Sequence, residues 1–225
     1  SLTYVRIEFA GFELAPDNEL NALTVAGCGT ASVIDHVQAH KGADDGVEVF
    51  GGTVQLRHIV VTQPDDDGLD SDFGWTGGAQ FVIVQQNALV GDKAFEWDSN
   101  KDDNDATPRN LPEVWNATLI GSDSEPGEAG KLQAAMHLRR GTGARISNSI
   151  IAHFTDFAIN VSDASSAGLD GDDLFVRASY FFDNANDIND GWPTGFDIFD
   201  VADDGAPEQL EEDDCVTPNV DCFDE

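Results

Sequence analysis

The sequence predicts an all-β fold, a parallel β-helix of about seven coils with inserted loops, and three observations predict it. The segment 29–74 states one pattern twice, so that Thr30 and Thr53 lie 23 residues apart. Two kinds of short strand alternate along the chain, and runs rich in Gly and Asp separate them. A repeat in the low twenties, built from short strands and turns, is typical of a β-solenoid.

The first kind of predicted strand is rich in β-branched and aromatic residues of alternating polarity. Its runs are 2–10, 31–39, 54–62, 79–87, 112–120, 144–152 and 174–182. The second kind is shorter and ends in turn-forming residues, with runs at 21–27, 46–52, 68–74, 94–100, 134–140, 157–163 and 195–201. Such short strands cannot bury both faces alone. We therefore expect the coils to stack about 4.8 Å apart around one apolar interior.

The spacing of the first strand kind predicts where loops enter. The residues expected at equivalent positions are Val33, Leu56, Phe81, Val114, Ile146 and Val176, with steps of 23, 25, 33, 32 and 30 residues. The longer steps contain the loops 97–112, 121–133, 162–173 and 183–195, which are rich in Asp, Asn, Gly and Pro. These residues favour exposed turns. A β-sandwich is the alternative fold, but it does not predict strict alternation of two strand kinds and needs more two-residue hairpin turns.

The chain is interpreted as one β-helix domain, 1–201, followed by an acidic tail or cap, 202–225. Cys215 and Cys222 lie in this tail, where a local disulfide would stabilise a segment with little core of its own. Cys28 lies in a run of small residues and is expected to pack as a small hydrophobic side chain. The chain begins inside a predicted strand, which indicates a processed or trimmed start or an edge that meets another chain.

Net charge limits the partners. The chain has 11 Lys and Arg against 43 Asp and Glu, a net charge of −32. Such a surface repels phosphate backbones and anionic membranes, so we expect no nucleic-acid partner. No apolar run is long enough for a transmembrane helix. An acidic surface is also typical of a solvated face in salty surroundings.

The Asp residues recur in register. Asp44, Asp66 and Asp92 each stand three residues before an apolar residue of a second-kind strand. Stacked coils would bring these carboxylates within about one strand spacing, where like charges repel. Ca²⁺ would compensate, because it accepts several carboxylate and carbonyl oxygens in an irregular cage. The predicted calcium ligands are Asp44, Asp45, Asp66, Asp67, Asp70, Asp92, Asp98 and Asp102. The alternative is that these residues form turns and face solvent.

Aromatic and basic residues indicate ligand binding. Trp75, Trp97 and Trp192 lie in or beside predicted loops, where an indole ring can stack on a sugar. Anchoring of these rings against the solenoid wall is the alternative. Arg139 and Arg140 are cations in a very acidic chain and are expected near the Asp-rich loops. No catalytic residue is predicted, because carboxylates are so frequent that any glycosidase-like pair could be drawn.

Four runs carry a resemblance to known proteins: LTYVRIEFAG, DDGVEVFGGTV, DDDGLDSDFGWTGGAQF and NDATPRNLPEVWNATLIG. They resemble a group of uncharacterised, secreted or cell-surface bacterial proteins, often lipoprotein-like, that form right-handed parallel β-helices. The resemblance covers residues 1–161. It implies a right-handed helix outside the cell or on its surface, and no particular activity. In that group, earlier coils usually precede the strand that LTYVRIEFAG matches, and this chain departs from the pattern by lacking them.

We therefore expect an extracellular structural or adhesive protein that Ca²⁺ stabilises and that associates end to end into a fibre or a smaller homo-oligomer. The alternative is a carbohydrate-active β-helix, either a polysaccharide lyase or a hydrolase, or a sugar-binding module for a neutral polysaccharide. A lyase would place Arg139 or Arg140 beside an Asp cluster in an open groove. A binding module would expose Trp97 and Trp192 on one flank.

Overall fold

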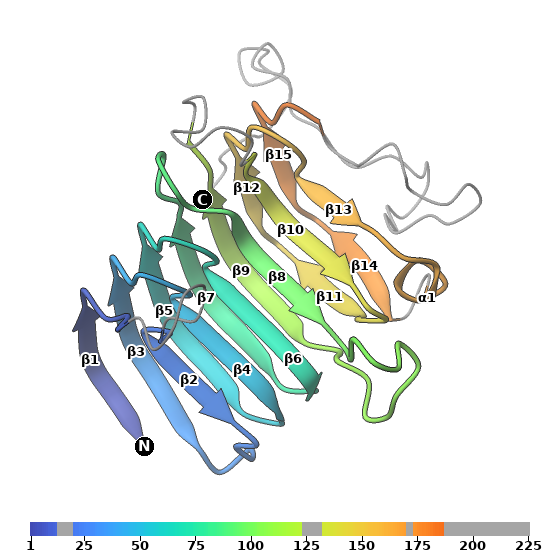
Figure 1. Ribbon diagram of the computed structural model, residues 1–225, viewed down its shortest axis with the longest axis horizontal. Coiled ribbons are helices and arrows are strands. Elements are labelled where there is room, and N and C mark those ends of the chain that lie inside the picture. Colours follow the sequence, from blue (N-terminus) through green and yellow to red (C-terminus); the bar gives the residue numbers. More distant parts are fainter. Residues whose placement is uncertain (13–19, 123–131, 170–172, 187–225) are drawn as a thin grey trace.

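The computed structural model describes residues 1–12, 20–122, 132–169 and 173–186 (Figure 1). They form a right-handed parallel β-helix, as predicted, in which the chain alternates between two parallel sheets. The predicted strand 195–201, the acidic tail 202–225 with Cys215 and Cys222, and Trp192 lie outside the described residues.

The strands occur where the sequence places them. The first sheet contains β1 (Leu2–Glu8), β3 (Val33–His40), β5 (Gln55–Thr62), β7 (Gly78–Gln85), β9 (Glu113–Ile120), β11 (Ala144–Ser147) and β14 (Leu174–Arg177), with β12 (Ile150–Ala152) and β15 (Tyr180–Phe182) alongside. The second sheet contains β2 (Leu23–Ala26), β4 (Val47–Gly52), β6 (Leu69–Trp75), β8 (Lys93–Asp98), β10 (Ala134–Arg139) and β13 (Ile159–Val161). The only helix among the described residues is α1 (Ala164–Ala167), inside the predicted loop 162–173. In that part of the chain no helix is long and apolar enough to cross a bilayer.

In the first sheet, each described coil has one residue within its strand that adopts the left-handed backbone conformation. These residues are Tyr4, His36, His58, Phe81, Asn116, Asn148 and Ala178, with φ between 46° and 60°. They break the alternation of side chains, so that two successive residues point away from the core. In the last two coils the interruption separates β11 from β12 and β14 from β15. Asn and His adopt this conformation more readily than most residues with a side chain.

The observed register corrects two of the six predicted equivalent positions. Leu56 lies beside Ile34 and Ala79 in the neighbouring strands, rather than beside Val33 and Phe81. Val33 and Phe81 are 46% and 45% exposed, whereas Ile34 and Ala79 face the core. The prediction failed because a small alanine occupies the core position while a phenylalanine occupies the left-handed outward position. The equivalence of Val114, Ile146 and Val176 is confirmed.

Aromatic residues fill the middle of the core. Phe95 stacks on Trp97 with ring centroids 4.9 Å apart, and Trp75 meets Trp97 edge to face at 6.5 Å. Both indoles are fully buried, and their N–H groups donate to the carbonyl oxygens of Val54 and Leu69. Neither ring can therefore stack on a sugar, contrary to the prediction. They anchor the wall, because a buried indole needs both apolar contact and one hydrogen-bond acceptor.

Candidate metal centre on the acidic face

Carboxylates of successive coils gather on the outward side of β4, β6 and β8 and on the turns that precede these strands, a surface called here the acidic face. Its residues are Asp44, Asp45, Glu48, Asp66, Asp67, Asp70, Asp72, Asp92, Glu96 and Asp98. The parallel register places Glu48, Asp70, Glu96 and His137 side by side on neighbouring strands. Side chains so placed are separated by about one strand spacing of 4.8 Å.

Two of these carboxylates are buried because they complete the backbone hydrogen bonding between coils. Asp67 N–H donates to Asp45 Oδ1 at 3.1 Å, and Lys93 N–H donates to Asp67 Oδ1 at 2.7 Å. Asn21 Oδ1 accepts from Asp45 N–H at 3.3 Å in the same way. This ladder explains why short acidic or amide side chains recur at the turn. It also takes two carboxyl groups out of water, which makes their ionisation costly without a compensating cation.

Ligand atoms converge in three groups on this face. Each group offers three carboxylate oxygens that lie within 4.8 Å of one another. The groups are Asp44 with Asp45 and Asp66, Asp45 with Glu48 and Asp70, and Asp66 with Asp67 and Asp92. Six predicted calcium ligands therefore come together, and Glu48 joins them as a residue that the sequence did not single out. Glu48 lies inside a strand, where an acidic side chain usually points to solvent and has no special role. Its place beside Asp70 becomes visible only from the register of the two strands.

Burial and like charges disfavour the ionised form of these groups. Burial raises the pKa of Asp45, Asp67 and Asp70 well above the usual range, and neighbouring carboxylates raise it further. Burial also raises the pKa of Glu48 to about 7, although a hydrogen bond from Asn21 opposes the shift. Raised carboxyl pKa values favour the protonated form, so a metal ion that binds here would release protons.

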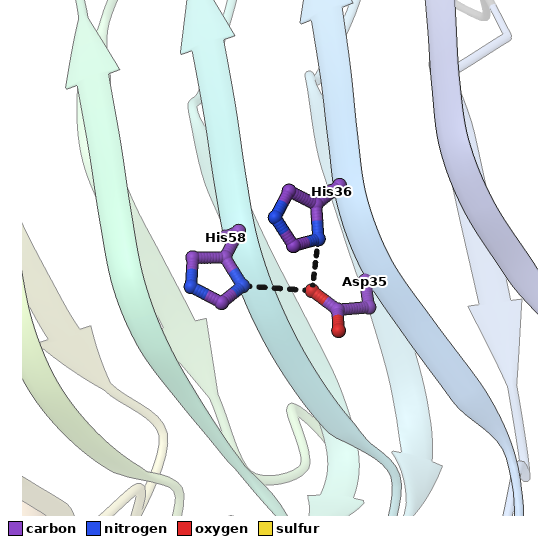
Figure 2. A group of neighbouring side chains, drawn as sticks. All are labelled: Asp35, His36 and His58. Carbon is purple, nitrogen blue, oxygen red and sulfur yellow. Dashed lines mark hydrogen bonds and ion pairs between the residues drawn. The ribbon is translucent and has the colours of Figure 1, made fainter.

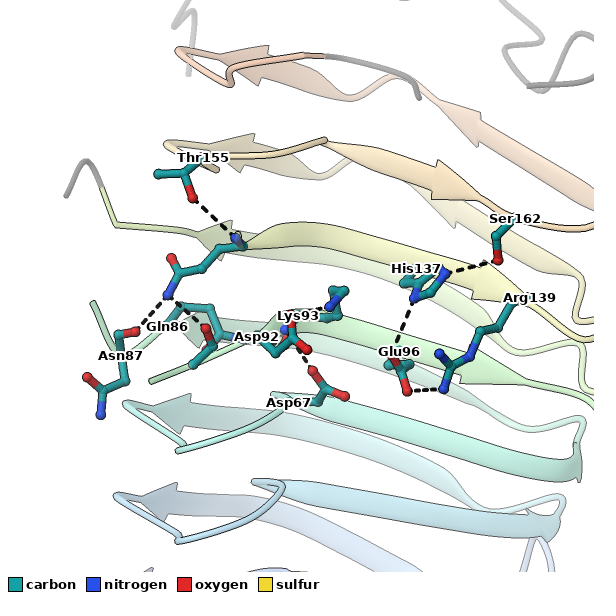
Figure 3. A network of polar contacts seen from close by, with 12 residues as sticks. Asp67, Gln86, Asn87, Asp92, Lys93, Glu96, His137, Arg139, Thr155 and Ser162 are labelled. Atoms are coloured by element: carbon teal, nitrogen blue, oxygen red, sulfur yellow. Dashed lines mark hydrogen bonds and ion pairs between the residues drawn. The ribbon is translucent and has the colours of Figure 1, made fainter. Parts of the chain in front are cut away.

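The neighbouring part of the acidic face is neutralised by the protein's own cations (Figure 3). Arg139 Nε donates to Asp98 Oδ1 at 2.7 Å, its Nη2 donates to Glu96, and Arg140 donates to Asp98. Burial opposes ionisation of Glu96, but the hydrogen bond with His137 and the charge of Arg139 lower the pKa of Glu96 overall. His137 Nε2 lies 3.0 Å from Ser162 Oγ.

Asp98 and Asp102, two further predicted calcium ligands, lie apart from the three groups. Asp98 is 4% exposed and engages two guanidinium groups, so its charge is already balanced. Asp102 is exposed on the inserted loop, where its N–H donates to Asn100 Oδ1. Arg139 and Arg140 do lie beside carboxylates, as expected. They act in ion pairs, and the bonds of Arg139 to Asp98 and Glu96 outweigh burial and raise the pKa of Arg139.

The raised carboxyl pKa values predict how stability depends on pH without divalent cations. The pKa of Glu48 is about 7 against an ordinary 4.5, and burial and Asp98 raise that of Asp72 to about 6 from 3.8. Between pH 4.5 and 7 the folded chain therefore holds more protons than the unfolded chain, so its stability falls as pH rises. Urea denaturation in EDTA at fixed ionic strength measures this, and Glu48→Gln should flatten the slope. The exposed Glu113→Gln should not, and a flat or rising wild-type curve would contradict the assignment.

Comparison with known proteins agrees with the architecture. The sequence profile of the family described as "Pectate-lyase like beta helix domain" matches residues 1–202. No curated protein matches the chain. No solved structure matches it either. With its stacked parallel coils and a match over most of its length, the chain belongs to the pectate-lyase-like β-helix domain family.

Proposed function

We propose that the chain is a calcium-binding β-helix that works outside the cell as a structural or adhesive protein. The observation that carries this proposal is the convergence of carboxylates from adjacent coils into three groups, in each of which three oxygens lie within 4.8 Å of one another. Such a group is stable near neutrality when its oxygens share a cation, because unscreened like charges at this distance repel strongly. The ion would connect adjacent coils and so strengthen their stacking.

The donor set favours Ca²⁺ over other common ions. All three groups on the acidic face offer carboxylate oxygens only, whereas Zn²⁺ prefers nitrogen and sulfur ligands. Ca²⁺ takes six to eight oxygens in irregular geometry, while Mg²⁺ demands a near-ideal octahedron. Gln86 is linked to the group that contains Asp67, because its amide nitrogen donates to Lys93 O and Lys93 N–H donates to Asp67. The buried Oε1 of Gln86 has no hydrogen-bond partner among the described residues. Extracellular calcium modules bind in the range of about 10⁻⁴–10⁻³ M, which suits a protein of the cell exterior.

Calcium should raise the unfolding temperature of the wild-type chain, and EDTA should reverse the effect. At a concentration about one hundred times Kd, one bound ion contributes roughly 2.7 kcal/mol. Asp67→Asn keeps the acceptor for Lys93 N–H but removes a charge, so we expect a smaller calcium-induced shift with no loss of stability in EDTA. Differential scanning calorimetry with and without Ca²⁺ measures both values.

The matched control for this experiment is Asp102→Asn, the same change at an exposed position outside the three groups. It should leave the calcium-induced shift intact. Equal shifts in Asp67→Asn and the wild type, or no response of the wild type to Ca²⁺, would remove the proposal.

Self-association would use the end of the solenoid formed by β1 and β2, the outermost strands of the two sheets among the described residues. Large apolar side chains gather at this end, with Tyr4 80%, Phe9 71% and Phe12 72% exposed. Open strand edges beside exposed aromatic residues favour pairing with another coil. A head-to-tail contact of this kind propagates into a fibre unless it closes.

Sedimentation velocity tests this part of the proposal. The wild-type chain should show assembly that increases with concentration, and Phe9→Asp should abolish it by placing a charge on the interface. Phe81→Asp is the control, since Phe81 is also exposed and left-handed, with φ of 60° against 52° for Phe9, but lies in a middle coil. A wild-type chain that stays monomeric at all concentrations, or equal effects of the two changes, would contradict end-to-end assembly.

A carbohydrate-active role is the second candidate, and one observation favours hydrolysis. Asp70 and Glu96 are register partners on β6 and β8, and their environments push their pKa values in opposite directions, upward for Asp70 and downward for Glu96. A carboxyl that favours its protonated form beside one that favours its ionised form is the arrangement expected of an acid–base pair. Lyase chemistry with Arg139 as the base is disfavoured, because its ion pairs raise the pKa of its guanidinium.

Release of reducing ends from a panel of neutral and uronic-acid polysaccharides tests this candidate. Glu96→Gln should lower the rate by at least about 10²-fold, in the range typical of a general acid or base. Asp102→Asn should keep the full rate. Product spectra with an unsaturated uronate would indicate elimination instead, and a rate unchanged in Glu96→Gln would exclude the assigned pair.

A further inference from the structure

Two histidines and an aspartate meet on the outward side of the first sheet, away from the acidic face (Figure 2). His36 and His58 occupy the same position in the neighbouring strands β3 and β5, and their ring centroids are 4.2 Å apart. Asp35 precedes His36 in the chain. Its Oδ1 lies 2.8 Å from His36 Nδ1 and 2.8 Å from His58 Nδ1. Both imidazoles thus direct the same nitrogen to one carboxylate oxygen.

The backbone and the neighbouring rings position this trio. His36 and His58 have φ of 54° and 50°, and this left-handed conformation directs Asp35 and His36 to the same side of β3. Tyr4 stacks on His36 at 4.5 Å, and Phe81 stacks on His58 at 5.0 Å, which limits where the imidazoles can move. Tertiary packing therefore preorganises the donors, which lowers the entropic cost of ordering these side chains when a ligand binds.

We propose that Asp35, His36 and His58 form a binding site for a divalent transition-metal ion of the Zn²⁺, Ni²⁺ or Cu²⁺ class. One ring nitrogen of each histidine and a carboxylate oxygen of Asp35 all lie within 4.8 Å of one another. Imidazole nitrogen with carboxylate oxygen is a donor set that these ions prefer. The ion takes the place of the contacts between each Nδ1 and Asp35. Each imidazole binds it through an unprotonated Nδ1 and carries its one proton on Nε2, so it remains a neutral ligand.

The geometry needs only a small adjustment. Metal–ligand bonds of about 2.0–2.2 Å at tetrahedral angles separate two donor atoms by about 3.4 Å. The present separation of each Nδ1 from Asp35 Oδ1 is 2.8 Å. The side chains of His36 and His58 are 40% and 42% exposed, so they can rotate by this amount and an ion can reach them.

The site is open on its outer side. His36 and His58 also line a groove of about 560 Å³ that runs over the same sheet, with Gln38 and Thr118 among the other lining residues. Three protein donors leave at least one position of a four-coordinate ion for water or another ligand. The groove gives that ligand room. This site contains nitrogen donors, unlike the oxygen-only groups of the acidic face. The proposal for it does not depend on calcium binding at those groups.

Isothermal titration of untagged protein with Zn²⁺ or Ni²⁺, in excess Ca²⁺ to occupy oxygen sites, tests the proposal. We expect one saturable binding event that Asp35→Asn and His58→Asn each weaken by at least about tenfold, as expected for loss of a ligand. Asn is the conservative choice at position 58, because Asn116 and Asn148 occupy the equivalent left-handed position in later coils. Imidazole ¹⁵N shifts should change at the Nδ1 atoms of His36 and His58.

His153→Asn is the matched control. His153 also has a positive φ, 66°, and lies 3.2 Å from Asp183, but no second histidine shares that carboxylate among the described residues. Its replacement should leave the affinity unchanged. The proposal is overturned if no saturable binding occurs, if His58→Asn binds as tightly as the wild type, or if the shifts change at His40, His137 or His153 instead.

Discussion

Parallel stacking of equivalent residues is the constraint on which the structure depends. Each strand pairs in register with its counterpart in the next coil. A side chain in a middle coil therefore has, about 4.8 Å away on either side, the residues that occupy the same position in the two adjacent coils. Apolar residues at a repeated position become a continuous core, as Ile59 and Val82 do in adjacent strands. Charged residues at a repeated position become a column of like charges, which the fold must balance.

The acidic face balances this repulsion in two ways. Where β8 lies beside β10, guanidinium groups do so: Arg139 and Arg140 neutralise Asp98, and Arg139 also binds Glu96. Where β4 lies beside β6, carboxylates outnumber cations, and burial and mutual repulsion raise the pKa of Asp45 and Asp67. Their oxygens also accept backbone N–H groups of the next coil, so these acidic residues are needed for a structural reason. A shared calcium ion would satisfy both requirements at once.

On the first sheet, the same stacking acts through backbone conformation. In each described coil a left-handed residue within the strand of this sheet turns a column of side chains outward. In the early coils this column consists of rings, from Tyr4 through His36 and His58 to Phe81. In later coils Asn116 accepts a hydrogen bond from Asn148 at 2.5 Å. This left-handed position has the same backbone conformation in each described coil but carries different side chains along the helix. Among the described residues, two imidazoles meet one carboxylate only in the early coils, at Asp35, His36 and His58.

The sequence by itself determined the solenoid, because alternating polarity and Gly- and Asp-rich turns are local signals. It also determined the alignment of Asp44, Asp66 and Asp92, since their offset from the strands is constant. Only the tertiary structure decided that Trp75 and Trp97 are buried, because both lie in strands, on the face that points into the core. It likewise decided that Asp98 is balanced by a residue 41 positions away, and that His36 meets His58. Such contacts follow from the register between coils. Inserted loops of variable length make this register hard to predict from the sequence alone.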